Sequence, residues 1–286
     1  MASLREIRRK IKSVKSTQQI TKAMKMVAAA RLRRAQARIL SARPFAQKME
    51  ELMTDLLIKI GSDHEHPLFK HRGGQRRALL LVTSDRGLCG AFNTNLIRET
   101  IKYLSKYGSQ NVDLFIVGRK GRDYFRRMGA QISKDYINIG NAVSFAQAEL
   151  IIADLLAGYE KHPWAAVDML YNEFKSVIQQ KLVVKTLLPL TPIEHVETRS
   201  WPDFLYEPVK EELLDAIILR FLKSQVFRVL LESSASELGA RMAAMDNATR
   251  NATELMSSLT LTMNRTRQAS ITKEILEVVS GAEALK

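Results

Sequence analysis

Two long stretches without helix-breaking residues, one at each end of the chain, limit what this sequence can fold into. Residues 3–60 contain no glycine and a single proline, Pro44, and residues 209–286 contain no proline at all. Because an α-helix rises about 1.5 Å per residue, each stretch can form a rod on the order of 90–110 Å long. Two such rods lie against each other only if the chain between them folds back. The sequence therefore predicts a long antiparallel pair of helices, with a folded domain formed by the chain that connects them.

Apolar and small residues recur along both ends with the spacing of a coiled coil. Nearly every step is three or four residues, which is typical of the narrow seam between paired helices and implies left-handed supercoiling. The N-terminal seam comprises Leu4, Ile7, Ile11, Val14, Gln18, Thr21, Met24, Ala28, Leu32, Ala35 and Ile39. The C-terminal seam comprises Leu231, Ala235, Leu238, Met242, Met245, Thr249, Ala252, Met256, Leu259, Met263, Thr266 and Ser270. Since Ala, Thr and Ser bury little apolar area, we expect a pair that is marginally stable alone and is held by partners.

Between the two rods the apolar pattern changes to that of strands and shorter helices. The pattern predicts strands at 78–83, 112–117, 132–139, 166–174 and 180–188, and helices at 92–107, 119–128 and 145–159 with Ser144 as N-cap. Such alternation favours a Rossmann-like α/β domain with a partly parallel sheet. The predicted domains are the N-terminal coiled-coil helix 1–60, the globular α/β foot 76–195 and the C-terminal coiled-coil helix 209–286.

Positive charge is concentrated on the N-terminal helix. The net charge is +14, and residues 1–50 hold fourteen Lys or Arg against Glu6 and Glu50. A basic helix can bind nucleic acid, anionic lipid or an acidic protein surface, so a nucleic-acid-binding coiled-coil protein stays open as an alternative. The sequence has no apolar run long enough to span a membrane and no signal-peptide pattern at its start. The single Cys89 forbids an internal disulfide, so we expect a soluble protein of a reducing compartment.

The pattern of polar residues does not point to catalysis. The loop 84–91 after the first strand has glycines three residues apart, without the Gly-x-Gly-x-x-Gly spacing that brings backbone against a pyrophosphate. Three histidines fall in the polar linker 61–74, but no matching set of metal ligands occurs elsewhere. Cys89 has no base beside it that the sequence reveals. We expect no catalytic, cofactor-binding or metal-binding residue, and keep a nucleotide-dependent enzyme as the weaker alternative.

Segments at both ends and in the middle carry a specific family pattern. They are residues 4–14 (LREIRRKIKSV), 17–29 (TQQITKAMKMVAA), 84–90 (SDRGLCG) and 267–282 (RQASITKEILEVVSGA). These segments closely resemble the gamma subunit family of F-type ATP synthases, in the right order and across the whole chain. The chain lacks the extra regulatory cysteine pair of chloroplast members, so it looks like a bacterial member.

The resemblance implies a central rotor shaft that is not itself catalytic. One such chain per complex enters a ring of three alpha and three beta subunits, and its foot rests on the c-subunit ring beside the epsilon subunit. Proton flow turns the ring and shaft while ATP is made at the beta subunits, and ATP hydrolysis drives the reverse rotation. The resemblance further implies no cofactor, no nucleic acid, and a peripheral place on the cytoplasmic face of the bacterial plasma membrane, with membrane association through the complex alone.

The resemblance also places partner contacts. It implies beta-subunit contacts at Lys22, Met24, Lys25, Met26, Arg267 and Gln268. It favours c-ring or epsilon contacts at Phe204, Leu205, Tyr206 and Glu207, for which packing against the chain's own α/β domain is the alternative. The apolar C-terminal end suggests a bearing held by non-directional contacts at Ile275, Leu276, Val278, Val279 and Leu285.

Overall fold

The chain forms two compact units. The computed structural model describes residues 3–60, 66–70, 72–140, 143–177, 179–190 and 210–283, without the side chains of 56–60, 210–213 and 283. The small unit comprises Met1–Ala28 and Arg241–Lys286, and the large unit comprises Ala29–Ala240. Since this division cuts through both end segments, the three predicted domain boundaries stay a prediction.

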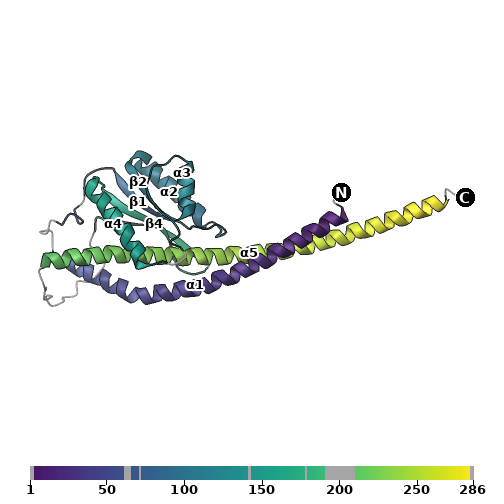
Figure 1. Cartoon of the computed structure of the whole chain (residues 1–286), viewed down its shortest axis with the longest axis horizontal. Helices are drawn as coiled ribbons and strands as arrows, with labels where there is room; N and C mark the ends of the chain where they lie inside the picture. The colour runs from purple at the N-terminus through teal and green to yellow at the C-terminus, as the bar shows by residue number, and fades with distance from the viewer. Residues whose placement is uncertain are drawn as a thin grey trace. The chain divides into compact units, whose positions relative to one another are not determined.

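The two end segments are the long helices that the sequence predicts. Helix α1 spans Leu4–Ile60 and helix α5 spans Lys210–Glu283 (Figure 1). Helix α1 continues through Pro44, where the missing N–H leaves one carbonyl without its usual helical donor. In the described part of the chain, no helix combines the length and the apolar character that crossing a bilayer requires.

A five-stranded mixed sheet forms the centre of the large unit. Its strands are β1 (Arg77–Val82), β2 (Val112–Val117), β3 (Ile132–Tyr136), β4 (Ala166–Phe174) and β5 (Gln180–Leu188), in the order β3-β2-β1-β4-β5. The first four are parallel, and β5 pairs antiparallel with β4 as the predicted hairpin. The connecting helices are α2 (Phe92–Tyr107), η2 (Ser109–Asn111), α3 (Arg119–Arg127) and α4 (Phe145–Lys161). This arrangement confirms the predicted Rossmann-like α/β fold.

Helices cover both faces of the sheet, which explains why its central strands are continuous apolar runs rather than alternating ones. On β1, Leu79 and Leu81 pack with α2 and α3, whereas Leu80 and Val82 pack with α4 and α5. Successive side chains of a strand point to opposite faces, so one strand contributes to two cores.

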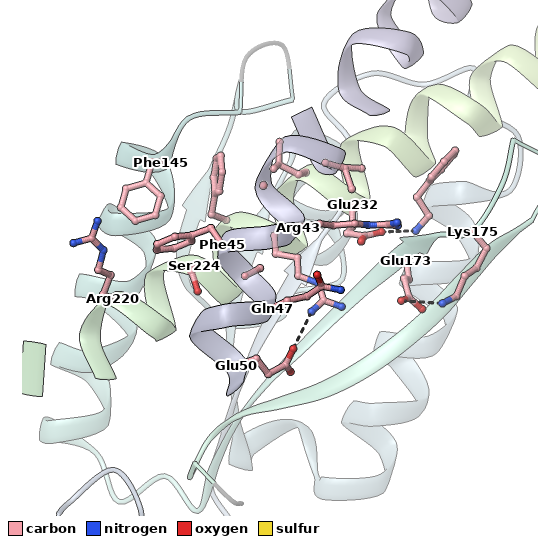
Figure 2. A pocket seen from close by; sticks show the side chains of 17 residues that line it. Arg43, Phe45, Gln47, Glu50, Phe145, Glu173, Lys175, Arg220, Ser224 and Glu232 are labelled. Carbon is pink, nitrogen blue, oxygen red and sulfur yellow. Dashed lines mark hydrogen bonds and ion pairs between the residues drawn. The ribbon is translucent and has the colours of Figure 1, made fainter. Parts of the chain in front are cut away.

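An ionic cluster joins α1, α5 and the sheet within the large unit. Glu50 of α1, labelled in Figure 2, lies 3.6 Å from Arg228 of α5 and 3.7 Å from Lys185 of β5. Burial lowers the pKa of Lys185, and the Glu50 carboxylate opposes that shift. The Glu50 carboxylate of α1 thus holds two cations, one from α5 and one from the sheet, that would otherwise repel each other.

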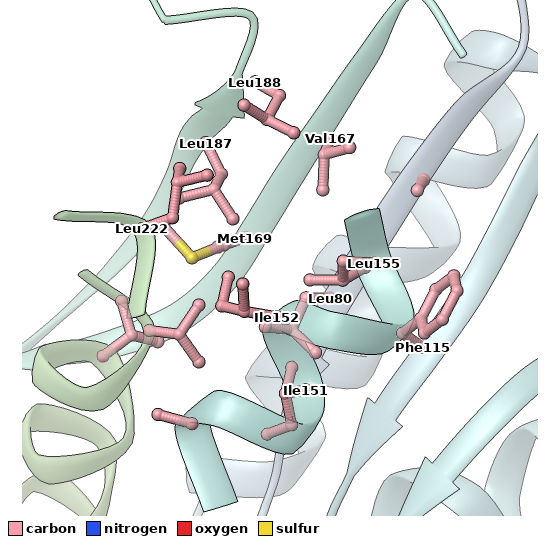
Figure 3. Close-up of a cluster of buried hydrophobic side chains, with 14 of the residues drawn as sticks. Leu80, Phe115, Ile151, Ile152, Leu155, Val167, Met169, Leu187, Leu188 and Leu222 are labelled. Carbon is pink, nitrogen blue, oxygen red and sulfur yellow. The ribbon is translucent and has the colours of Figure 1, made fainter. Parts of the chain in front are cut away.

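The larger core lies between the sheet, α4 and the long helices (Figure 3). Ile151, Ile152 and Leu155 of α4 are at most 1% exposed and point toward the strands. Leu222 of α5 meets the same cluster, next to Met169 of β4. The sheet thus buries part of α5 through large apolar side chains.

Local sequence accounts for several element boundaries. Helix α4 begins after Ser144 with a capping box, in which the Gln147 side chain accepts the Ser144 backbone N–H at 2.9 Å. Strand β1 begins one residue before its predicted start, because the Arg77 guanidinium pairs with Asp168 of β4 at 2.8 Å. Gly118 has φ 96°, and a Cβ there would lie 2.3 Å from the Thr83 carbonyl oxygen. This close approach requires glycine.

Candidate partner-binding surface

In the small unit the two helices pair through the predicted seam. The seam positions from Leu4 to Ala28 are buried or half-buried, and so are those from Met242 to Ser270, while most of the residues between them are exposed. Polar side chains join across the seam in order along α1: Gln18 Nε2 to Thr253 Oγ1 (2.6 Å), Thr249 Oγ1 to Thr21 Oγ1 (2.8 Å), and Lys25 Nζ to Asp246 Oδ1 (2.5 Å). Since the α1 positions ascend as the α5 positions descend, the pairing is antiparallel, as predicted.

Lys25, a predicted beta-subunit contact, has a partner inside the chain. Its ammonium pairs with Asp246, which also lies 3.3 Å from Arg250 one helical turn later. The hydrogen bond from Lys25 lowers the pKa of Asp246. The sequence did not reveal this pair because it depends on the register between two helices more than 200 residues apart. An experiment on Lys25 therefore has to separate this internal pair from the predicted partner contact.

The other predicted contacts on α1 point in different directions. Met24 lies on the seam and is half-buried. Lys22 is exposed, and Met26 is 60% exposed. An exposed methionine next to exposed cations gives this stretch an adaptable apolar patch with positive charge beside it.

The end of α5 extends beyond the register of α1. Lys25 and Asp246 fix the register of the two helices. Extending this register by three heptads toward the start of α1 places Leu4, its first residue, opposite Arg267 of α5. Arg267 and Gln268 are exposed, and so is every residue from Ile271 to Ala282. The predicted bearing residues Ile275, Leu276, Val278 and Val279 are 57%, 60%, 72% and 53% exposed. Within the described part of the chain, this apolar end is left uncovered.

Threonines along the second half of α5 bond to their own helix. Five of them donate the side-chain hydroxyl to the carbonyl four residues earlier, at 2.8–3.0 Å: Thr253, Thr260, Thr262, Thr266 and Thr272. This pattern satisfies the hydroxyl hydrogen within the helix, without a partner.

Two predicted groups fall outside the described residues. Phe204, Leu205, Tyr206 and Glu207, predicted to contact the c ring or epsilon, lie in the segment 191–209, and Leu285 lies beyond residue 283. Their contacts stay predictions.

The crevice at the carboxyl ends of β1 and β2 is nearly filled. The Asp85 carboxylate there accepts the backbone N–H groups of Arg119, Asn138 and Gly140 at 3.0–3.4 Å. Residues of α5, among them Ser233 and Glu237, close the remaining space to about 20 Å³. That volume is close to that of one water molecule, so this crevice has no room for a nucleotide.

Among the described residues no group of three or more His, Cys, Asp and Glu side chains converges as metal ligands would. His66 from the polar linker instead hydrogen-bonds Asp215 of α5 through Nε2 at 3.0 Å. His64 and His71 lie outside the described residues.

Comparison with known proteins places this geometry in one family. The family model described as ATP synthase matches residues 3–285. An ATP synthase gamma chain from Anaeromyxobacter sp. (strain Fw109-5) is 48% identical over the full length of both chains, and one from Heliobacterium modesticaldum is 45% identical over the full length of both. A chain in the Tetrahymena thermophila mitochondrial ATP synthase central stalk and c-ring structure is 31% identical. The match has a TM-score of 0.62 and covers 80% of this chain and 99% of that one. A chain from the Euglena gracilis mitochondrial ATP synthase, at 22% identity, has the same fold with a TM-score of 0.70, over 99% of this chain and 94% of that one.

Proposed function

This chain belongs to the family of ATP synthase gamma chains, and from that premise we propose that it is the central rotor shaft of an F-type ATP synthase. As such it couples proton-driven rotation of a c-subunit ring to ATP synthesis or hydrolysis at the beta subunits. The observation that carries the proposal is the antiparallel helical pair, whose seam of small residues leaves large apolar side chains exposed for partners. The match to a central-stalk chain supports it.

The proposed partners are three alpha and three beta subunits around the helical pair, and the c ring and epsilon at the globular part, with one gamma chain per complex. The chain itself is proposed to carry out no catalytic step. We place the complex at the cytoplasmic face of the bacterial plasma membrane, where this chain is peripheral and reaches the membrane through its partners.

Rotation can drive catalysis because the helical pair is asymmetric. Basic side chains are concentrated on α1, and large apolar side chains such as Ile20 and Leu261 are exposed beside the seam, so three chemically identical beta subunits around the pair meet different surfaces. Differential contact is what shifts a conformational equilibrium, so each beta subunit is biased toward a different state. Turning the pair exchanges those biases among the three subunits.

The proposed beta contacts are Lys22, Met24, Lys25 and Met26 on α1 and Arg267 and Gln268 on α5. Exposure of Lys22, Met26, Arg267 and Gln268 supports these assignments. We assign Ile275, Leu276, Val278, Val279 and Leu285 to an apolar bearing at the end of α5, and Phe204, Leu205, Tyr206 and Glu207 to the c ring or epsilon.

Reconstitution tests the rotor function. Alpha and beta subunits are mixed with and without this chain, and ATP hydrolysis is measured, with proton pumping measured after addition of the membrane sector. We expect sustained hydrolysis and pumping only with the chain present. Equal hydrolysis in its absence would refute the proposal.

Charge reversal at Lys25 tests the beta contact. Lys25→Glu breaks the pair with Asp246 and also reverses the charge offered to a beta subunit. The swap Lys25→Glu with Asp246→Lys restores an internal ion pair and keeps the reversed charge at position 25. We expect both variants to reduce coupled pumping. Full recovery in the swap would show that position 25 acts through internal pairing alone.

A further inference from the structure

A cavity of about 680 Å³ opens in the large unit, whereas the residues of the proposed beta contacts and bearing belong to the small unit. Its walls come from α1, α5, the start of α4 and the end of β4 with Lys175 beyond it (Figure 2). Ligand sites in proteins typically enclose about 300–1,000 Å³, so the volume suits a small organic molecule.

Aromatic rings gather at one end of this cavity. Figure 2 shows Phe45 and Phe145 there with Arg220 nearby. The ring of Phe145 meets that of Phe227 edge-on, with centroids 5.6 Å apart. Phe45 is nevertheless 44% exposed and Phe145 is 38% exposed. These rings leave apolar area uncovered inside a concave site.

The acidic side chains of the cavity are already engaged. Glu50 pairs with Arg228 and Lys185, and Glu173 lies 3.1 Å from Lys175. Glu232 accepts the backbone N–H of Phe174 at 2.9 Å.

Two basic side chains of the same cavity remain uncompensated. Arg43 and Arg220 have no carboxylate within ion-pair distance in the described part of the chain. The Arg220 guanidinium lies 5.7 Å from the centre of the Phe45 ring. An anion at this position would meet a free guanidinium directly beside an aromatic surface.

We propose that this cavity binds a small amphipathic carboxylate, with its alkyl or aromatic body against Phe45, Phe145 and Phe227. Its carboxylate is held by Arg220, and Arg43 supplies a second positive charge. The site is separate from the proposed contacts with the beta subunits. The ligand is a free molecule in solution rather than a segment of a protein.

Displacement of a fluorescent reporter from the full-length chain tests this site. The reporter is 8-anilinonaphthalene-1-sulfonate, and the competitors are decanoate and decanol, which share an alkyl chain and differ in charge. We expect decanoate to displace the reporter at a concentration at least about tenfold lower than decanol, since a charge-assisted hydrogen bond is lost with the alcohol.

Matched substitutions locate the binding. Arg220→Gln should weaken decanoate about tenfold, while Arg38→Gln, an exposed arginine of α1 outside the cavity, should leave it unchanged. Ala42→Trp fills the cavity and should abolish displacement, whereas Ala37→Trp, on an exposed position of the same helix, should not. Circular dichroism verifies the folding of each variant, and Arg220 is exposed, so its replacement is expected to fold.

Several results would overturn the site. Equal competition by decanol and decanoate would mean an unspecific apolar patch. Equal binding by Arg220→Gln and Arg38→Gln would remove the anion anchor. The isolated chain could bind decanoate and lose that binding in the complex with alpha, beta and epsilon. If epsilon also protected Phe45 from hydrogen exchange, the cavity would be assigned to a protein segment. Activity of the rotor is not a readout here, so failure of this site leaves the proposed function untouched.

Discussion

The large unit and the small unit bury different chemistry. In the large unit, Leu79, Leu80 and Leu81 on neighbouring positions of one strand are each 0% exposed, and the surrounding side chains are large and apolar. In the small unit the seam relies on alanine, threonine and methionine, and hydrogen bonds such as Thr21–Thr249 cross it. Large apolar residues of the small unit stay outside, with Ile20 57% and Leu261 61% exposed.

This contrast indicates where each unit obtains its stability. Burial of apolar area contributes about 25 cal/mol per Å², which favours the large unit strongly and the small unit weakly. Each hydrogen bond across the seam adds about 0.5–1.5 kcal/mol. The large unit is therefore stable through its own core, and the small unit gains stability from whatever covers its exposed side.

The largest effect is expected from a core substitution in the large unit. Leu155 of α4 is 0% exposed, and Leu155→Ala should lower the free energy of unfolding by about 2–5 kcal/mol. Leu150 on the same helix is 55% exposed, and Leu150→Ala should change the free energy of unfolding by about 0.5 kcal/mol or less. Urea unfolding followed by near-UV circular dichroism measures both. Similar losses at the two positions would mean that the core does not dominate.

A smaller effect is expected at the seam of the small unit. Thr249→Val removes one of two bonded hydroxyls and should lower the local stability of the small unit by about 0.5–1.5 kcal/mol. The double variant Thr21→Val with Thr249→Val removes both hydroxyls and should leave that stability nearly unchanged. Amide hydrogen exchange of residues 11–28 in the full-length chain reports this local stability. If the two single costs simply add in the double variant, the hydroxyl pair contributes no coupling.

A still smaller effect depends on pH at Asp246. Because Lys25 lowers the pKa of Asp246 below its ordinary 3.8, the pair stabilises the folded small unit above that pH. This contribution is lost as pH falls through the depressed pKa. Exchange rates of wild type and Asp246→Asn should therefore differ at pH 7 and converge as the pH is lowered below 3.8. Glu254→Gln, at an exposed acid of the same helix, serves as the control and should match wild type throughout.

The smallest effect on the isolated chain is expected from removing residues 276–286. The described side chains in this stretch are exposed, so the unfolding midpoint of the isolated chain should not move. In the proposed complex each apolar side chain buried there contributes about 1.5–3 kcal/mol, so the assembled complex should dissociate at a lower temperature. Single-molecule rotation should persist with reduced torque. Complete loss of rotation in a complex that still assembles would contradict the bearing.

Most of the fold could be predicted from periodicity. Helix α2 and strands β2, β4 and β5 have the predicted bounds, because their apolar runs end at glycine or at polar turns. The seam positions could be predicted because alternating steps of three and four residues place side chains along one narrow stripe of a helix. The start of β1 was missed by one residue, since a charged Arg77 does not look like a strand residue until Asp168 is beside it.

The candidate sites were less accessible to sequence reasoning. Exposed positions such as Lys22 and Arg267 came from family resemblance, because an exposed charge has no periodic signal of its own. The Lys25–Asp246 pair needs the register of two distant segments. The cavity beside Phe45 is built from four elements. That Arg220 has no carboxylate partner in the described part of the chain can be recognised only once the partners of the surrounding carboxylates are known.

The threonines of α5 that bond to their own backbone have a mechanical consequence. A hydroxyl already committed to a carbonyl at 2.8–3.0 Å offers no hydrogen to a neighbouring protein. These positions therefore add no hydrogen-bond donor to any contact that this part of α5 makes. Turning of the proposed shaft breaks no hydrogen bond donated by these hydroxyls, so directional resistance comes from other side chains such as Arg267 and Gln268.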